Sequence, residues 1–92
     1  MTGRRVDLNH GIIRDGLREC GYIVEDMSAA GHGFPDLLVG ANAALVLLEV
    51  KRPGEELTPR ELRFHAKFCQ YPVYVVTSLE DALSRLGEVW RQ

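Results

Sequence analysis

The sequence has few cysteines, no long apolar run and almost no net charge, and each shortage narrows the classes of protein that fit. None of its 92 residues belongs to a stretch near the ~20 apolar residues that a transmembrane helix needs, so we expect no membrane span. The early basic residues are not followed by an apolar segment, so we expect no signal peptide. A net charge of −2 gives no overall basic field that would indicate nucleic acid, although a local basic face remains compatible with it.

Only two cysteines are present, Cys20 and Cys69, and their spacing is not that of a metal-binding motif. Both lie in apolar, helix-like segments, so we expect buried free thiols and a reducing compartment. No repeat, low-complexity tract or linker divides the chain. We therefore expect one domain over residues 1–92, with residues 1–7 as a flexible arm. That length is close to the lower limit for a single hydrophobic core, which favours oligomerisation.

The apolar periodicity predicts seven elements in the order α-β-β-β-α-β-α. Because the last two strands are joined through a helix, they should be parallel, whereas the hairpin strands should be antiparallel. The fold class is therefore α/β, with a mixed central sheet flanked by helices. The expected elements are a helix from an Asn9 N-cap to Gly21, strands at 22–27, 36–39 and 44–48, a helix after Thr58, a strand at 72–77 buried on both faces, and a helix from Ser78 to Gly87.

Local signals support the two later helices. Thr58 with Pro59 and Glu61 forms a capping-box pattern, and Ser78 with Asp81 forms a similar pair. Gly16 weakens the first helix, which indicates a close backbone contact at that position. The apolar residues near the end of the chain with no obvious core position are candidates for an interface between subunits: Tyr71, Val89 and Trp90.

The stretch from Gly33 to Lys51 places charged residues at the end of an otherwise apolar hairpin. Asp36 begins its first strand, while Glu49 and Lys51 end the second and point to one face because they are two residues apart. A turn around residues 40–42 would bring Asp36 and Glu49 to the same end of the pair. Charges at the margin of a core are unfavourable unless they are paired or bind a metal ion. The pattern therefore predicts a divalent-metal site with a lysine beside it.

Simpler interpretations exist for each of these residues when it is taken alone. Asp36 after Pro35 is a common turn residue, and Glu49 with Lys51 is a common solvated pair. His65 lies on the apolar side of its helix, which favours a structural role. His10 fits a residue at the start of a helix.

A longer pattern resembles a known family. Gly33-Phe34-Pro35-Asp36 and Glu49-Val50-Lys51 resemble the PD-(D/E)XK nuclease signature. The later segments Leu57-Thr58-Pro59, Phe64-His65, residues 72–76 and Asp81-Ala82 are similar to the VRR-NUC family, especially its small stand-alone phage and bacterial members. The resemblance covers roughly residues 7 to 87. It implies a restriction-endonuclease-like core and a Mg²⁺- or Mn²⁺-dependent DNA endonuclease. It also implies a homodimer that cuts branched DNA such as flaps or Holliday junctions, in the cytoplasm of a bacterial or phage-infected cell.

The resemblance also implies roles for individual residues. Asp36 and Glu49 match the metal-binding carboxylates, the backbone carbonyl of Val50 a further metal ligand, and Lys51 the catalytic lysine. Glu61 stands where the family usually has glutamine. The acidic residue that related families place on the first helix is replaced by Ile12, and the neighbouring polar residues that could substitute for it are Asp7, Asn9 and His10.

Affinity for DNA would come mostly from contacts to phosphates. Residues 28–35 contain two glycines and a proline and form a loop, called the glycine loop below. The candidate DNA-binding residues are Arg4 and Arg5 on the arm, His32 in the glycine loop, Arg52 beside the site, and Arg60, Arg63 and Lys67 on the following helix. His32 is also a candidate replacement ligand, and the three helical cations could equally form an ordinary solvated face. No base-reading motif is visible, so we expect recognition of shape rather than sequence.

Two other functions stay open at this point. One is a DNA-binding module of the same fold that is catalytically weak or inactive, because Ile12 offers no carboxylate. The other is a small protein-interaction domain with no nucleic-acid role.

Overall fold

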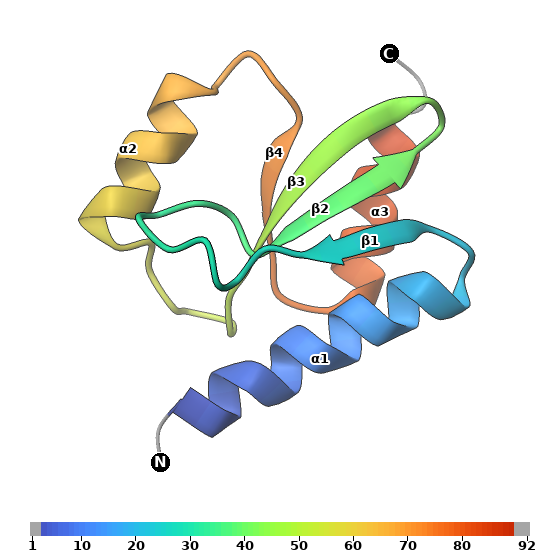
Figure 1. Ribbon diagram of the computed structural model, residues 1–92, viewed down its shortest axis with the longest axis horizontal. Helices are drawn as coiled ribbons and strands as arrows, with labels where there is room; N and C mark the ends of the chain where they lie inside the picture. The colour runs from blue at the N-terminus through green and yellow to red at the C-terminus, as the bar shows by residue number, and fades with distance from the viewer. Residues whose placement is uncertain (1–2, 90–92) are drawn as a thin grey trace.

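The structure, a computed structural model, describes the backbone of residues 3–89 and the side chains of residues 8–89 (Figure 1). The predicted order α-β-β-β-α-β-α is confirmed. The elements are α1 (Gly3–Glu19), β1 (Ile23–Asp26), β2 (Leu37–Ala41), β3 (Ala44–Val50), α2 (Pro59–Lys67), β4 (Val73–Val76) and α3 (Leu79–Val89).

The four strands form one mixed sheet in the order β1-β2-β3-β4. β1 pairs with β2 and β2 with β3 in antiparallel fashion, whereas β3 and β4 are parallel. The tight turn between β2 and β3 lies at Asn42 and Ala43, which both have positive φ, and not at the expected residues 40–42. Two positive φ values are the geometry of a two-residue turn that matches the twist of its strands. Gly40 therefore stays inside β2.

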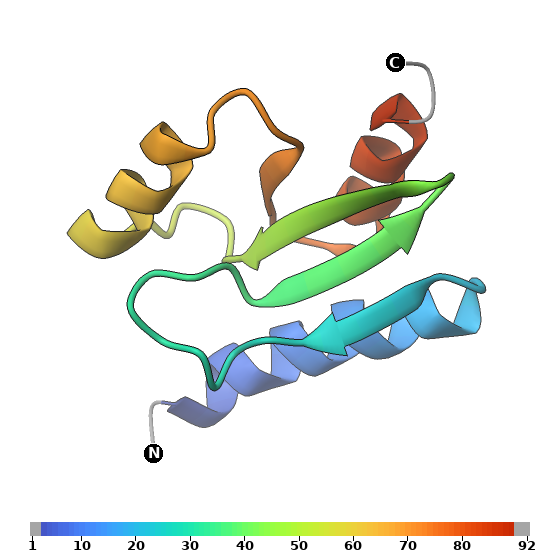
Figure 2. The same cartoon turned by 45° about the horizontal axis from the view of Figure 1, so that its top comes forward.

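One face of the sheet carries the hydrophobic core. Alternate residues of β2 and β3 point to it, and α1 and α3 cover it in both views (Figures 1 and 2). The fully buried side chains on this side include Ile13, Leu17, Leu37, Val39, Val46, Leu48, Val76, Ala82 and Leu86. The close contact expected at Gly16 is confirmed, because an added Cβ would lie 2.6 Å from Leu79 of α3. Tight packing of the two helices thus fixes the core.

α2 stands apart from the other two helices, at the end of the sheet where β2 begins and β3 ends (Figure 2). It has no buried residue. α2 is stabilised by the predicted capping box of Thr58 and Glu61, which the structure confirms, and by aromatic contacts. Phe64 stacks on Phe68 with 4.5 Å between ring centroids and meets Phe34 of the glycine loop edge-on at 5.1 Å.

The start of the chain differs from the prediction. α1 begins at Gly3, so Asn9 is not an N-cap and residues 3–7 have helical backbone in place of the expected arm. The end of α1 is as predicted: Gly21 has a φ of +96°, and the N–H groups of Gly21 and Tyr22 donate to the carbonyls of Arg18 and Leu17. Asn9 was misassigned because the same side chain that caps helices also serves long-range hydrogen bonds.

Four smaller predictions are also wrong. Cys20 and Cys69 are free but exposed, because α1 and α2 end before them. α3 continues through Gly87 to Val89, and Val89 packs in the core, where it cannot serve an interface. β4 has only Val76 fully buried, so it is not covered on both faces. Trp90 lies outside the described residues.

None of the helices within residues 3–89 combines the length and the apolar content that crossing a membrane requires.

Candidate functional site

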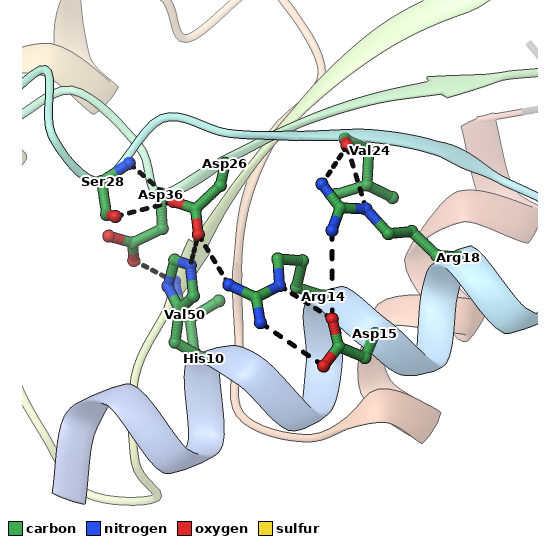
Figure 3. Close-up of polar contacts among 9 residues, drawn as sticks. All are labelled: His10, Arg14, Asp15, Arg18, Val24, Asp26, Ser28, Asp36 and Val50. Atoms are coloured by element: carbon green, nitrogen blue, oxygen red, sulfur yellow. Dashed lines mark hydrogen bonds and ion pairs between the residues drawn. The ribbon is translucent and has the colours of Figure 1, made fainter. Parts of the chain in front are cut away.

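The paired ends of β2 and β3 bring together the two carboxyl groups predicted to bind a metal ion. Leu37 pairs with Leu48, so Asp36 and Glu49 flank the last rung of this ladder, as expected. The N–H of Val50 donates to Oδ2 of Asp36 over 2.8 Å, a bond visible in Figure 3. This bond fixes the Asp36 carboxylate beside the end of β3.

Glu49 is a buried carboxyl group that is only partly hydrogen-bonded. It is 2% exposed, and its Oε1 atom is buried with no hydrogen-bond partner. Burial and the neighbouring carboxyl of Asp36 raise the pKa of Glu49 from 4.5 to about 9. Without a cation, the ionised form of Glu49 is therefore disfavoured at this position.

Lys51 lies among three glutamates. Its Nζ is 2.8 Å from Glu61, 3.8 Å from Glu55 and 3.9 Å from Glu49. Burial lowers the pKa of Lys51, but the hydrogen bond to Glu61 and the charges of the three glutamates outweigh it and raise the pKa overall. Lys51 is therefore a permanent cation in this site and not a group that accepts a proton.

Glu61 connects α2 to this site through a single oxygen atom. Oε1 accepts a hydrogen bond from the Thr58 N–H over 2.8 Å and is the same atom that meets Lys51. Burial raises the pKa of Glu61, but Lys51 and Thr58 lower it by more, so the carboxylate stays ionised. The residue that caps α2 thus also holds the lysine in place.

His65 follows Glu61 by one turn of α2. Its Nε2 atom is buried and has no hydrogen-bond partner, and burial lowers its pKa. Its ring and that of Phe64 are steeply inclined to each other, with 6.4 Å between ring centroids. The structural role expected for His65 therefore leaves one polar atom unsatisfied.

The two candidates on α1 whose side chains the structure describes, Asn9 and His10, bond to other groups than a metal site would require. Ile12 is 60% exposed, whereas His10 is buried, with Nε2 2.9 Å from Oδ2 of Asp26 (Figure 3). Asn9 donates through its side-chain N–H₂ to the carbonyls of Lys51 and Thr77 at the ends of β3 and β4. α1 therefore contributes hydrogen bonds that hold the strand ends, and His10 lies inside the helix, not at its start.

Asp26 is the centre of a small polar network at the end of β1. Arg14 donates to its Oδ2 over 2.9 Å, and the N–H and hydroxyl of Ser28 donate to its Oδ1 (Figure 3). Burial alone would raise the pKa of Asp26, but the hydrogen bonds from Ser28, His10 and Arg14 hold it well below its usual range. Both carboxylate oxygens of Asp26 have hydrogen-bond partners, as is usual for a carboxylate with a structural role.

The candidate DNA-binding residues do not form one surface. His32, Arg60, Arg63 and Lys67 line a common groove with Phe64. Arg52 is not among the residues that line this groove, and its Nε lies 3.6 Å from Oε1 of Glu55. The side chains of Arg4 and Arg5 lie outside the described residues.

The candidate metal ligands are of the chemical type that a hard divalent cation prefers, but they are few in number. Asp36 and Glu49 are oxygen donors of the type Mg²⁺ and Mn²⁺ prefer, and the buried, unpartnered Oε1 of Glu49 is an atom that a cation would satisfy. Among the described side chains, no group of three or more histidine, cysteine, aspartate or glutamate residues has metal-binding geometry. A bound Mg²⁺ would therefore keep most of its water ligands, as this ion usually does.

No family model matches the chain, and no similar curated protein or solved structure was found. The resemblance to VRR-NUC nucleases therefore stays a prediction.

Sequence reasoning missed one contributor to the site and one contact outside it. Glu55 was not singled out, although its spacing of four residues from Lys51 was a usable signal. The link between His10 and Asp26 had no local signal, because the two residues are 16 positions apart in different elements.

Proposed function

We propose that this protein is a divalent-metal-dependent hydrolase of phosphodiester bonds, with DNA as its substrate. The observation that carries the proposal is the buried Glu49 carboxyl, which faces Asp36 with one oxygen unpartnered and a lysine 3.9 Å away. Such a group is destabilising for the fold alone, and a bound cation would remove the cost. This reading agrees with the PD…EVK resemblance of the sequence.

Asp36 and Glu49 would hold the metal ion, with the carbonyl of Val50 as the further ligand that the resemblance implies. When bound, Mg²⁺ or Mn²⁺ supplies a Lewis acid that polarises the phosphoryl oxygen and lowers the pKa of a bound water. The chain's own contribution is the position of the donors, which the bond between Val50 and Asp36 and the β2–β3 pairing both fix.

Lys51 would stabilise negative charge on the phosphate. Because its pKa is raised, it stays a cation at neutral pH, and it can donate to a phosphoryl oxygen without changing its protonation state. Glu61 orients Lys51 from α2 over 2.8 Å. We therefore assign Glu61 a positioning role and Lys51 a catalytic role.

The finer properties come from the resemblance. They are selectivity for branched DNA, such as a flap or four-way junction, and assembly as a homodimer with two sites. Tyr71, which is 65% exposed, is the member of the expected interface set that the described surface leaves available.

The test is cleavage of labelled duplex, flap, single-stranded and four-way-junction DNA in Mg²⁺ and in Mn²⁺. Asp36→Asn, Glu49→Gln and Lys51→Met remove one group each with little change of shape. Glu25→Gln, an exposed carboxyl on β1, is the matched control. We expect metal-dependent cutting by the native chain and by Glu25→Gln, and a loss of at least about 100-fold in the three site variants. Equal rates in all five proteins, or no cutting of any substrate, would contradict the proposal.

A second candidate is a catalytically weak or inactive DNA-binding module of the same fold. Two observations favour it: Ile12 points to solvent, so α1 adds no carboxylate, and the described residues offer only a two-carboxylate site. Binding of DNA without cleavage in Mn²⁺ would select this alternative.

A further inference from the structure

The described basic side chains fall into two groups that differ in their partners. Five of them have a carboxylate oxygen within 4.0 Å: Arg14, Arg18, Lys51, Arg52 and Arg85. Three others, Arg60, Arg63 and Lys67, form no ion pair with any side chain of residues 8–89. Acidic residues outnumber basic ones in this chain, so carboxylates are not scarce. The unpaired cations are therefore concentrated in one place.

These three cations also share one stripe of α2. Arg60 and Arg63 are three residues apart, and Arg63 and Lys67 are four apart, so neighbouring members repel each other by a few tenths of a kcal/mol per pair. They line a groove of about 260 Å³ together with His32 and Phe64. The guanidinium of Arg60 lies 3.4 Å from Nδ1 of His32. The cations of an ordinary solvated helix face would meet only water, whereas these three face a second segment of the chain across the groove.

The opposite wall is the glycine loop, and two contacts hold it against α2. Gly33 has a φ of +83°, and a Cβ at this position would lie 2.6 Å from the backbone carbonyl of Arg60. Only glycine allows the loop backbone to approach the first turn of α2 so closely. Phe34, the next residue, packs against Phe64. The position of His32 at the groove is thus set by the backbone and not by a flexible side chain alone.

We infer that the groove of His32, Arg60, Arg63 and Lys67 binds the phosphodiester backbone of a nucleic acid beside the candidate metal centre. The inference rests on the proposed function for the identity of the ligand. The cations extend over about 10 Å of the helix axis, which corresponds to about three phosphates of one strand and exceeds a single small anion. Guanidinium groups bind phosphate oxygens in pairs, which suits Arg60 and Arg63 to this role.

The same helix connects this groove to the candidate metal centre. Arg60 lines the groove, and the next residue, Glu61, holds Lys51 at 2.8 Å. A strand bound along the groove would therefore pass the same turn of α2 that holds Lys51. The inference also divides the expected DNA-binding set, because Arg52 is already paired with Glu55 and lies outside the groove.

The test is the salt dependence of binding to a fluorescein-labelled 20-base-pair duplex, measured by anisotropy in EDTA so that no cleavage occurs. We expect Arg63→Gln and Lys67→Gln each to reduce the slope of log K against log [salt] by about 0.9, and the triple Gln variant with Arg60 by about 2.7. Arg85→Gln is the control, since it removes an exposed helical arginine that is paired with Glu88. It should leave the slope unchanged, and circular dichroism checks that each variant is folded.

An unchanged slope in the triple variant would overturn the inference, as would absence of DNA binding by the native chain. Displacement of the duplex by poly-glutamate at equal charge concentration would also overturn it, in favour of an acidic protein partner. Failure of the proposed function looks different: binding would depend on the groove while no metal-dependent cleavage occurs. Conversely, cleavage with an unchanged slope would support the hydrolase and reject the groove.

Discussion

The two faces of the central sheet are built on opposite principles, although the same strands form both. On the side of α1 and α3, residues such as Val46 and Leu48 of β3 are fully buried among apolar neighbours. On the other side, Leu45 is 69% exposed and Glu49 is a buried carboxyl next to a buried lysine. α2, which lies by the charged end of this face, has no buried residue at all.

This difference shows which face of the sheet stabilises the fold and which face contains groups that destabilise it. The face of α1 and α3 collects the hydrophobic stabilisation of the fold. The side near α2 holds an unpartnered carboxyl oxygen at Glu49, an unpartnered ring nitrogen at His65 and three unpaired cations. Each of these features is unfavourable for folding and useful for binding charged ligands. Four experiments test this contrast between the faces, beginning with the substitution that should cost the most stability.

Leu48→Ala should lower the free energy of unfolding by about 3–4 kcal/mol, because it removes a fully buried side chain from the core face. Leu45→Ala, in the same strand but on the other face, should change it by less than about 0.5 kcal/mol. Urea denaturation followed by circular dichroism measures both. Similar losses in the two variants would mean that a partner or a second subunit also covers the outer face.

Gly33→Ala should lower the free energy of unfolding by about 2–3 kcal/mol, since it adds a Cβ at positive φ and drives it into the backbone of Arg60. Gly31→Ala is the matched control. Gly31 also has a positive φ, +69°, but nothing lies within 4 Å of its added Cβ, so about 1 kcal/mol is expected. If both substitutions cost the same in urea denaturation, the contact between the loop and α2 contributes nothing.

The stability of the metal-free protein should fall as the pH rises from 4.5 toward 9. The folded-state pKa of Glu49 is raised to about 9, so folded Glu49 keeps a proton that the unfolded chain releases above 4.5. The unfolded state then binds fewer protons than the folded state, so stability decreases as the pH rises through this range. Thermal melts in EDTA across the pH range measure the effect.

Glu49→Gln provides the control for this pH dependence. The stability of this variant should no longer fall as the pH rises from 4.5 toward 9. At pH 8 in EDTA, the variant should be more stable than the native chain. Mg²⁺ should raise the melting temperature of the native chain at pH 8 and leave Glu49→Gln unaffected. A flat pH profile for the native protein, with no response to Mg²⁺, would argue against a cation at Glu49.

Thr58→Ala should have the smallest global effect, about 1 kcal/mol, because it removes the oxygen that accepts the Glu61 N–H at the start of α2. Since α2 has no buried residue, we expect hydrogen exchange to accelerate in α2 while α3 is little changed. Thr58→Ser keeps the cap and is the control. Equal acceleration in both helices would show that α2 is part of the same cooperative unit as the core.

Much of the fold was predictable because it depends on signals that are local in the sequence. The order of elements, the antiparallel hairpin, the Thr58 capping box and the end of α1 at Gly21 all follow from residues close to one another. The convergence of Asp36, Glu49 and Lys51 was predictable for the same reason. A two-residue turn and the two-residue period of a strand fix which side chains meet at its end.

The errors occurred where one side chain has two possible uses. Asn9 resembles an N-cap but instead bonds to the carbonyls of Lys51 and Thr77. His10 seemed to start a helix but is buried against Asp26. Cys20 and Cys69 were expected to be buried because they continue the apolar spacing of their helices, yet both follow the last turn of a helix and are exposed. Local propensity does not distinguish these uses, since the choice depends on distant partners.

The α/β class, the element order and the candidate charges at the end of the hairpin were predictable from the sequence alone, because hydrophobic periodicity and turn chemistry act over a few residues. The folded structure was needed to show that Glu61 holds Lys51, that Glu49 is buried with an unpartnered oxygen, and that three α2 cations line a groove with His32 and no carboxylate partner among the described side chains. These properties depend on desolvation and on distances between segments far apart in the chain, and both exist only once the chain has folded.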